Sequence, residues 1–166
     1  IINLIHSKQP TIVELGCYWA FYSMWFLKEL SNSRAYLVEP DPEKLKCGQK
    51  NFEMNNFTGD WTQAYVGAKY LNLDTFLLDK RINYVDILHV DIQGAEAEML
   101  IGAKNHFTER KINYAFISTH SQKLHLECLD CLNRYNYYTV YSADFYQTRC
   151  CDGIIVASSE PLSFNI

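Results

Sequence analysis

The sequence predicts an α/β fold of the Rossmann-like class, with a mostly parallel seven-stranded sheet and helices on both of its faces. Short apolar runs alternate with longer amphipathic segments along the whole chain. Several runs end on Gly or on a carboxylate, which is typical of strands buried on both faces of a parallel sheet. The 166 residues contain no internal repeat or linker-like segment, so we expect a single domain over residues 1–166.

The first half of the chain contains three strand-like and three helix-like segments. The predicted strands cover residues 11–16, 35–39 and 61–66, and the predicted helices cover residues 19–30, 42–55 and 73–78, the last being a short helix or a turn. The first strand is a β-branched apolar run that ends in Gly16. Pro42 stands in the first turn of the second helix, where its missing N–H costs nothing.

The second half continues the same alternation. The predicted strands cover residues 84–91, 112–119, 138–142 and 153–157, and the predicted helices cover residues 95–107 and 121–135. The last two strands can pair as a hairpin. Right-handed crossovers between the parallel strands then bring the loops that follow them to one edge of the sheet.

Composition and charge argue against several classes of protein. Lys and Arg total 15 against 19 Asp and Glu, a formal net charge of −4, whereas a dedicated nucleic-acid binder normally carries a basic surplus. No secretory signal opens the chain, and no apolar run approaches the ~20 residues of a membrane span. The six cysteines indicate reduced thiols in a cytoplasmic protein. The chain begins with Ile rather than Met, as a domain trimmed at its N-terminus would.

The carboxyl ends of the first two predicted strands are the expected ligand site, because ligands of open α/β sheets bind where the strand order reverses. Gly16 ends the first strand and lets the backbone turn tightly and approach a ligand. Glu39 ends the second strand, where a carboxylate can accept hydrogen bonds from two ribose hydroxyls of an adenosine. The structural alternatives are an ordinary strand-to-helix turn and a capping carboxylate.

The loop after Gly16 indicates which adenosine cofactor to expect. A dinucleotide needs several glycines so that its pyrophosphate can sit against the helix N-terminus. Tyr18 and Ala20 occupy the candidate positions in this chain. A bulky loop beside an acidic strand suits the zwitterionic methionine tail of S-adenosylmethionine better, and Glu14 can reach its ammonium group, directly or through water.

Four blocks of sequence, in order, resemble the FkbM family of S-adenosylmethionine-dependent methyltransferases over nearly the whole chain. Residues 13–23 (VELGCYWAFYS) resemble the opening loop of the family, and residues 37–56 (LVEPDPEKLKCGQKNFEMNN) resemble its Glu-Pro ribose segment. Residues 73–77 (LDTFL) and 86–103 (DILHVDIQGAEAEMLIGA) resemble its Leu-Asp pair and its Asp-x-x-Gly-x-Glu signature. The resemblance implies a class I methyltransferase fold, S-adenosylmethionine as cofactor, and a hydroxyl acceptor on a sugar or other small molecule.

The resemblance also implies which residues surround the cofactor. These residues are Glu14, Gly16, Cys17, Tyr18, Glu39, Pro40, Asp41 and Asp91. The opening loop departs from the family pattern, because Tyr18 stands where Asn is common and Ala20 stands where Gly is common. Many family members carry Glu where Gln93 stands, whereas this chain has no carboxylate at that position.

Asp91 and His120 are the predicted catalytic residues. Asp91 ends the fourth strand and can orient the acceptor, hold a divalent metal or take the hydroxyl proton. His120 follows the fifth strand, and an imidazole with a pKa near ~6.5 suits proton transfer near neutrality. The structural alternatives are a turn carboxylate and a polar residue before the N-cap Ser121. Glu96 is interpreted as a charge at a helix start, and His89 as a core or supporting residue whose hydrogen bonds are satisfied.

A structural zinc site is the alternative use of the cysteines. Cys128 and Cys131 form a Cys-x-x-Cys pair near His125, but they fall on the apolar stripe of a predicted helix rather than on a knuckle. The adjacent Cys150 and Cys151 would point to opposite faces of a strand. We therefore expect buried packing rather than zinc.

Three classes of function remain open at this point. An O-methyltransferase is favoured. A nicotinamide-dependent oxidoreductase is disfavoured by the missing glycines after Gly16. A non-catalytic nucleotide-binding module is expected only if the altered loop no longer admits a cofactor. The sequence leaves the oligomeric state and the identity of the acceptor undetermined.

Overall fold

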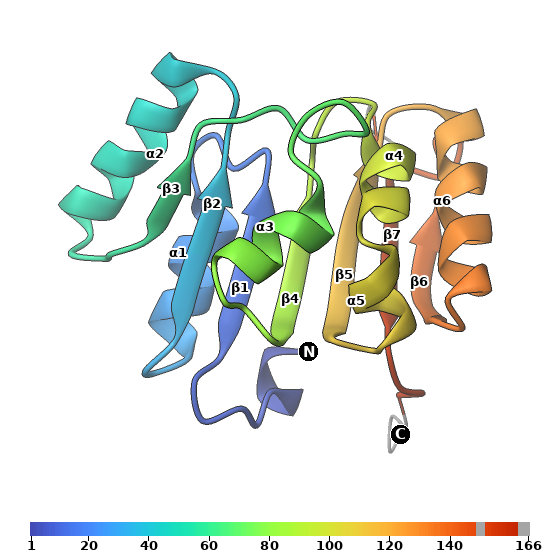
Figure 1. Ribbon diagram of the computed structural model, residues 1–166, viewed down its shortest axis with the longest axis horizontal. Helices are drawn as coiled ribbons and strands as arrows, with labels where there is room; N and C mark the ends of the chain where they lie inside the picture. The colour runs from blue at the N-terminus through green and yellow to red at the C-terminus, as the bar shows by residue number, and fades with distance from the viewer. Residues whose placement is uncertain (149–151, 163–166) are drawn as a thin grey trace.

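The computed structural model describes residues 1–148 and 152–162, and its centre is a seven-stranded sheet (Figure 1). The strands, in the spatial order β3-β2-β1-β4-β5-β7-β6, are β1 (Thr11–Leu15), β2 (Arg34–Val38), β3 (Asp60–Thr62), β4 (Val85–Val90), β5 (Ile112–Thr119), β6 (Tyr138–Ala143) and β7 (Gly153–Ser158). Neighbouring strands from β3 through β5 are parallel, whereas β7 is antiparallel to β5 and β6. The predicted mostly parallel, seven-stranded sheet is confirmed.

Helices cover both faces of the sheet, as predicted. They are the 3-10 helix η1 (Ile2–Leu4) and the α-helices α1 (Phe21–Glu29), α2 (Pro42–Met54), α3 (Leu73–Asp79), α4 (Glu96–Gly102), α5 (Lys104–Thr108) and α6 (Gln122–Arg134). Phe26 of α1 and Phe52 of α2 pack in one core cluster, and α3 to α6 contribute to a second. Figure 1 shows α1 behind the sheet and α3, α4 and α5 in front of it.

The strand order reverses between β1 and β4, which lie side by side at the centre of the sheet. Every residue of these two strands is buried, which explains why both are mostly apolar rather than alternating between apolar and polar residues. The carboxyl ends of β1, β2, β4 and β5 lie at the upper edge of the sheet in Figure 1. This edge therefore contains the switch point at which open α/β sheets bind ligands.

The first predicted helix begins later than expected, at Phe21 rather than at residue 19. Ala20 has a left-handed backbone, with φ 59° and ψ 34°, and cannot continue a right-handed helix toward Trp19. The third strand is also shorter than residues 61–66, because pairing with β2 stops at Thr62. The residues that follow Thr62 are consequently free to form a loop at the ligand-binding edge.

The predicted helix 95–107 is two helices that meet at Ala103. The carboxylate of Asp74 accepts hydrogen bonds from the backbone N–H groups of Asn105 and His106, at 2.8 and 3.0 Å. These bonds satisfy free donors at the start of α5, so a new helix begins there. The capping residue lies on α3, about thirty positions earlier, and no local pattern could have identified it.

Cys128 and Cys131 are buried on α6 and pack in the core, as the apolar stripe predicts. Both ring nitrogens of His125 are hydrogen bonded, to Thr119 Oγ1 and Ser142 Oγ at 2.9 Å each. Cys150 and Cys151 lie outside the described residues. Within residues 1–148 and 152–162, no three His, Cys, Asp or Glu side chains are grouped so that they could hold a metal ion.

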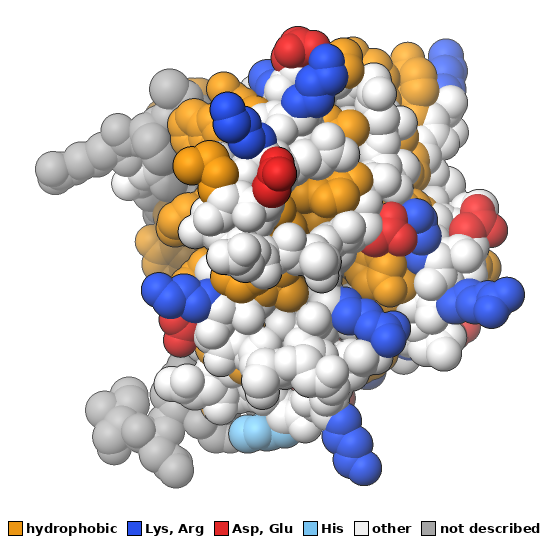
Figure 2. Space-filling view, turned by 90° about the vertical axis from the view of Figure 1, so that its left-hand side faces the viewer, with side chains coloured by type: hydrophobic (Ala, Val, Ile, Leu, Met, Phe, Trp, Pro, Cys, Tyr) orange, Lys and Arg blue, Asp and Glu red, His pale blue; other side chains and the backbone are white. Residues whose placement is uncertain are grey.

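The face on the left of Figure 1 carries acidic and basic side chains interspersed with apolar ones, rather than a field of one sign (Figure 2). A search of the helices in the described part of the chain finds none with the length and apolar character that crossing a bilayer requires.

Candidate functional site

The loop after β1 lies directly against the end of β4. Gly16 has φ 77°, and a Cβ atom at this position would overlap the backbone carbonyl of Asp91. The Asp91 N–H in turn donates to Leu15 O at 2.9 Å. Glycine is therefore required here both by its backbone conformation and by the close approach of the two segments.

The same loop is held over the end of β2. The N–H groups of Gly16 and Cys17 donate to the carbonyl of Val38, at 2.8 and 3.1 Å. Tyr18 (φ 36°) and Ala20 (φ 59°) have left-handed backbones without being glycines. The departures from the family pattern therefore stand at positions where Asn and Gly would fit with less strain. Strain of this kind persists where the surrounding structure holds it.

Glu39 lies at the end of β2 and is buried. One of its carboxylate oxygens accepts from the Tyr18 N–H at 3.2 Å, and the other accepts from the Asp41 N–H at 3.0 Å. Asp41 is the N-cap of α2, since its side chain accepts from the N–H groups of Glu43 and Lys44. The capping role that was the alternative for Glu39 therefore belongs to Asp41, and Glu39 orders the loop next to it.

Two cavities open at this edge of the sheet. The first, which we call the Glu39 cavity, has a volume of about 480 Å³ and is lined by Glu39, Pro40 and Asp41. The second, the Glu14 cavity, has a volume of about 790 Å³ and is lined by Glu14 and Cys17. Gly16, Tyr18 and Asp91 line both cavities. All eight residues predicted to surround a cofactor thus lie on one or both of two adjoining cavities of the size that small ligands occupy.

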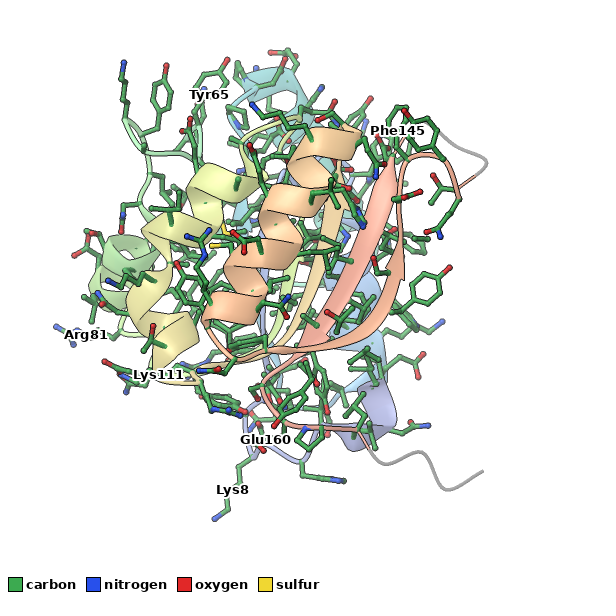
Figure 3. All side chains as sticks on the ribbon, turned by 90° about the vertical axis from the view of Figure 1, so that its right-hand side faces the viewer. Lys8, Tyr65, Arg81, Lys111, Phe145 and Glu160 are labelled. Atoms are coloured by element: carbon green, nitrogen blue, oxygen red, sulfur yellow. The ribbon has the colours of Figure 1, made fainter. Side chains whose placement is uncertain are left out.

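Sequence reasoning missed the residues that close the far side of the Glu39 cavity. Tyr65 and Tyr70, whose ring centroids are 5.5 Å apart, line it from the loop after β3, and Lys44 lines it from α2. Figure 3 shows Tyr65 at the same end of the molecule as Phe145, far from Lys111. Tyr65 fell inside the strand predicted over residues 61–66, so its place on the ligand-binding edge was hidden by the misplaced end of that strand.

Glu14 is a buried carboxylate at the floor of the Glu14 cavity. Its Oε2 accepts from the Ser23 N–H at 3.0 Å and from the Ser23 hydroxyl. Burial raises the pKa of Glu14 to about 7, and the negative charge of Asp91 acts in the same direction. A cation placed in this cavity would favour the ionised carboxylate.

Asp91 and His120 lie together, as the strand ends predict, with His120 Nε2 3.1 Å from Asp91 Oδ1. The opposite ring nitrogen, Nδ1, lies 2.9 Å from Glu96 Oε1. The amide nitrogen of Gln93, Nε2, lies beside both groups, 2.9 Å from Asp91 Oδ1 and 2.8 Å from His120 Nε2. Asp152 Oδ1 is a third carboxylate oxygen near the imidazole, 3.5 Å from Nε2.

The carboxylates around His120 change the role expected for it. Hydrogen bonds to Asp91 and Glu96 raise the pKa of His120 to about 10 against the opposing effect of burial. The hydrogen bond from His120 lowers the pKa of Asp91. His120 is therefore an imidazolium near neutral pH, and the expectation of a neutral base with a pKa near ~6.5 does not fit its surroundings.

Glu96 is more than a charge at a helix start. It is fully buried, and its Oε1 also accepts from the N–H groups of Ile92 and Gly94, at 3.3 and 3.2 Å. The carboxylate therefore holds the turn after Asp91 and the His120 ring in one arrangement. Within a low-dielectric interior, a buried charge of this kind requires an opposite charge nearby, which His120 provides.

His89 does not fit the expectation of satisfied hydrogen bonds. It is buried on β4, and its Nδ1 has no hydrogen-bond partner among the described residues. Burial lowers its pKa to about 4, so the ring is neutral near pH 7. Its ring stacks on Tyr22 with the centroids 3.9 Å apart.

Comparison with solved structures shows the fold of the chain. The TrmK protein of M. capricolum, in complex with S-adenosylhomocysteine, has a TM-score of 0.65 and 18% identity over 99% of this chain and 68% of that one. The N-terminal domain of human METTL16, in complex with S-adenosylhomocysteine, has a TM-score of 0.66 and 16% identity over 96% and 66%. The architecture is that of Rossmann-like class I methyltransferases, as predicted.

Comparison with curated proteins finds a distant relative, the 2-O-methyltransferase NoeI of Sinorhizobium fredii (strain NBRC 101917 / NGR234). The two are 20% identical over 69% of this chain, and the chain spans 65% of the length of that relative. Residues 58–138 match the methyltransferase FkbM domain. This segment includes the Leu-Asp pair and the Asp-x-x-Gly-x-Glu signature on which the predicted resemblance depended, and the resemblance to the FkbM methyltransferase family is confirmed.

Proposed function

We propose that the protein transfers a methyl group from S-adenosylmethionine to a hydroxyl oxygen of a sugar or other small-molecule acceptor. The observation that carries this proposal is the meeting of two cavities at Gly16, Tyr18 and Asp91, on the switch-point edge of a chain that resembles the FkbM family. The relative NoeI is named a 2-O-methyltransferase, which favours oxygen as the accepting atom. When bound, S-adenosylmethionine supplies the electrophilic methyl group of its sulfonium.

The residues of the Glu39 cavity fit the adenosine end of this cofactor. Each Glu39 oxygen has a further lone pair beside its backbone hydrogen bond, so the carboxylate can also accept from ribose hydroxyls. Pro40 and Asp41 continue the wall of the cavity. The rings of Tyr65 and Tyr70 offer a planar base an aromatic surface at the open side.

The residues of the Glu14 cavity fit the methionine end. The turn at Gly16 and Cys17 lines this cavity directly after β1. Glu14 is the buried carboxylate that an ammonium group would pair with. Since the pKa of Glu14 is about 7 in the free protein, pairing with a cation would expel a proton from the protein near neutral pH.

Asp91 is the residue that orients the acceptor in this proposal. Its carboxylate is ionised, because His120 and Gln93 hydrogen bond to it and lower its pKa. An ionised carboxylate at the junction of the two cavities can accept the hydrogen bond of an acceptor hydroxyl and would take up its proton when that oxygen replaces sulfur on the methyl carbon. His120 acts through Asp91, as a cation that keeps this carboxylate charged and fixed.

Calorimetry with S-adenosylhomocysteine and with NAD tests the cofactor. We expect binding of S-adenosylhomocysteine alone. Transfer of a labelled methyl group from S-adenosylmethionine to a panel of sugars and phenols then tests the reaction. Binding of NAD alone would favour the oxidoreductase, and binding of neither would favour a non-catalytic module. Activity abolished by chelator and restored by magnesium would assign Asp91 to a divalent metal instead.

A further inference from the structure

A third cavity lies against α1, on the face of the sheet that carries η1. It has a volume of about 110 Å³, and we call it the α1 groove. Trp25, Phe116 and Ile154 are among its apolar walls, and its polar lining is limited to Tyr22, His89 and Ser118. Trp25 is 49% exposed, so the groove is open to solvent at an aromatic rim.

The α1 groove adjoins the Glu14 cavity. Tyr22 and His89 line both of them, and their stacked rings form the boundary. His89 is paired in register with Glu14 on the neighbouring strand. Asp91 follows His89 by two positions, just past the end of β4, so it continues on the same face of the sheet. A molecule that reached from Asp91 past His89 would enter the groove.

His89 gives the boundary a property that packing alone does not explain. Only 9% of this residue is exposed, and its Nδ1 has no partner among the described residues. A buried polar atom without a hydrogen bond is destabilising, and such atoms require an explanation in a folded protein. A ligand that displaces Tyr22 and approaches the imidazole would supply the missing partner.

We propose that the α1 groove binds an apolar part of the methyl acceptor, while the hydroxyl-bearing part of the same molecule lies at Asp91. This proposal rests on the proposed methyltransferase function and adds the chemical class of the acceptor: a neutral hydroxylated ring joined to an alkyl or aryl group. A fully hydroxylated group in the groove would lose its hydration to walls with few hydrogen-bonding partners. An apolar group of benzene size is appropriate, since an engineered apolar cavity of about 150 Å³ binds benzene.

A homologous series of alkyl glucosides tests this directly. The dissociation constants of methyl, butyl and hexyl β-D-glucopyranoside are measured by calorimetry, with and without saturating S-adenosylhomocysteine. Burial of one methylene contributes about 0.8 kcal/mol, so we expect affinity to rise about three- to fourfold per added methylene. Affinity that does not depend on chain length would overturn the proposal.

Three variants connect the effect to the groove. Ile154→Thr removes an apolar wall group while keeping a β-branched residue in the strand, and Ser118→Phe fills the space from the neighbouring strand. Both are expected to flatten the dependence on chain length. The matched control Ile101→Thr changes an exposed residue of α4 and should leave the dependence intact.

The outcomes separate this proposal from the proposed function. Binding of S-adenosylhomocysteine with no preference for longer glucosides would overturn the groove as an acceptor site and leave the cofactor assignment standing. A chain-length dependence unchanged in both groove variants would place the alkyl group elsewhere and also overturn it. Self-association that buries Trp25 and is insensitive to the glucosides would assign the groove to a second copy of the chain. Failure to bind S-adenosylhomocysteine would contradict the proposed function itself.

Discussion

His120 Nδ1 lies 2.9 Å from the Oε1 atom of Glu96, a carboxylate with no exposed surface. The two residues are 24 positions apart, one directly after β5 and the other in the first turn of α4. The other ring nitrogen, Nε2, lies 3.1 Å from Asp91 Oδ1. One imidazole therefore connects Asp91, the carboxylate proposed to orient the acceptor, to the buried carboxylate of Glu96. The charge state of His120 therefore affects both of these carboxylates.

The first prediction is that His120 does not titrate between pH 5 and 8. Its ordinary pKa of 6.5 is raised to about 10 by Asp91 and Glu96, so the ring stays protonated across this range. Histidine resonances followed by NMR should show no transition for His120 over this range. A His120 transition near neutrality would restore its interpretation as a general base.

The interactions of His120 with Asp91 and Glu96 should also make the free energy of unfolding decrease as the pH rises. A raised pKa in the folded state contributes stability that is fully present below pH 6.5 and is lost as the pH rises through about 10. The difference in unfolding free energy between the wild type and His120→Gln should therefore shrink from pH 6 to pH 10 in urea titrations. His6→Gln, at an exposed position, is the control, and its unfolding free energy should differ little from that of the wild type.

The second prediction concerns Glu39. Glu39→Gln retains the size of the side chain but removes the charge that strengthens hydrogen bonds to ribose, each worth roughly 1.5–3 kcal/mol. We expect the affinity for S-adenosylhomocysteine to weaken roughly tenfold or more, as measured by calorimetry. Glu43→Gln, on the exposed side of α2, is the control. An unchanged affinity in folded Glu39→Gln would remove this residue from the ligand site.

The third prediction follows from the raised pKa of Glu14. The ammonium group of S-adenosylhomocysteine favours the ionised form of Glu14. Binding should therefore strengthen as the pH rises toward 7, and below pH 7 it should release a proton from Glu14. Calorimetry in buffers of different ionisation enthalpy measures the proton directly. Glu14→Gln should bind with an affinity that no longer varies over this range, and a variation that persists would assign the proton to another group.

Glu14 should also affect the stability of the free protein. Its folded-state pKa is raised from 4.5 to about 7, so the stability it contributes is fully present below pH 4.5 and is lost as the pH rises through about 7. Glu14→Gln should therefore stabilise the protein more at pH 8 than at pH 5, by at most about 3 kcal/mol. Thermal unfolding at the two pH values tests this, with Glu43→Gln as the exposed control.

The fourth prediction separates two reasons for glycine at the site. Gly16→Ala combines a backbone at φ 77° with an overlap against the Asp91 carbonyl, whereas Gly94→Ala meets no atom within 4 Å and only adopts an unfavourable φ of 114°. Backbone strain of this kind costs about 1–3 kcal/mol. We expect Gly16→Ala to lower the free energy of unfolding by more than Gly94→Ala does. Equal losses in urea unfolding would contradict the close approach of Gly16 to β4.

The fifth prediction concerns the unpartnered nitrogen of His89. His89→Phe keeps a ring that can stack on Tyr22 and removes a buried polar atom, so it should raise the melting temperature of the ligand-free protein. The same change should weaken the binding of alkyl glucosides, since the edge of the ring that a ligand could reach becomes apolar. A lower melting temperature would show that the imidazole is satisfied in solution.

Most of the fold, and the edge of the sheet at which the two cavities open, could be predicted from the local pattern of apolar and polar residues. Buried central strands require apolar runs, and each run ended where Gly16, Glu39 or Asp91 stands, which placed these residues at one edge. The length of β3 and the break in helix 95–107 could not be predicted in this way. Both depend on distant partners: register with β2 in the first case and capping by Asp74 in the second.

The sequence by itself determined the alternation of strands and helices, the edge of the sheet at which the two cavities open, and several of the residues that line them, because these depend on periodicity and on where buried runs end. Only the tertiary structure decided the states of those residues. His120 is a cation because Glu96 and Asp91 lie on both sides of its ring, and Glu14 has a raised pKa because it is buried. Nδ1 of His89 has no hydrogen-bond partner among the described residues. A pKa and a hydrogen bond are set by the atoms within a few ångströms, and residues far apart in the chain supply those atoms.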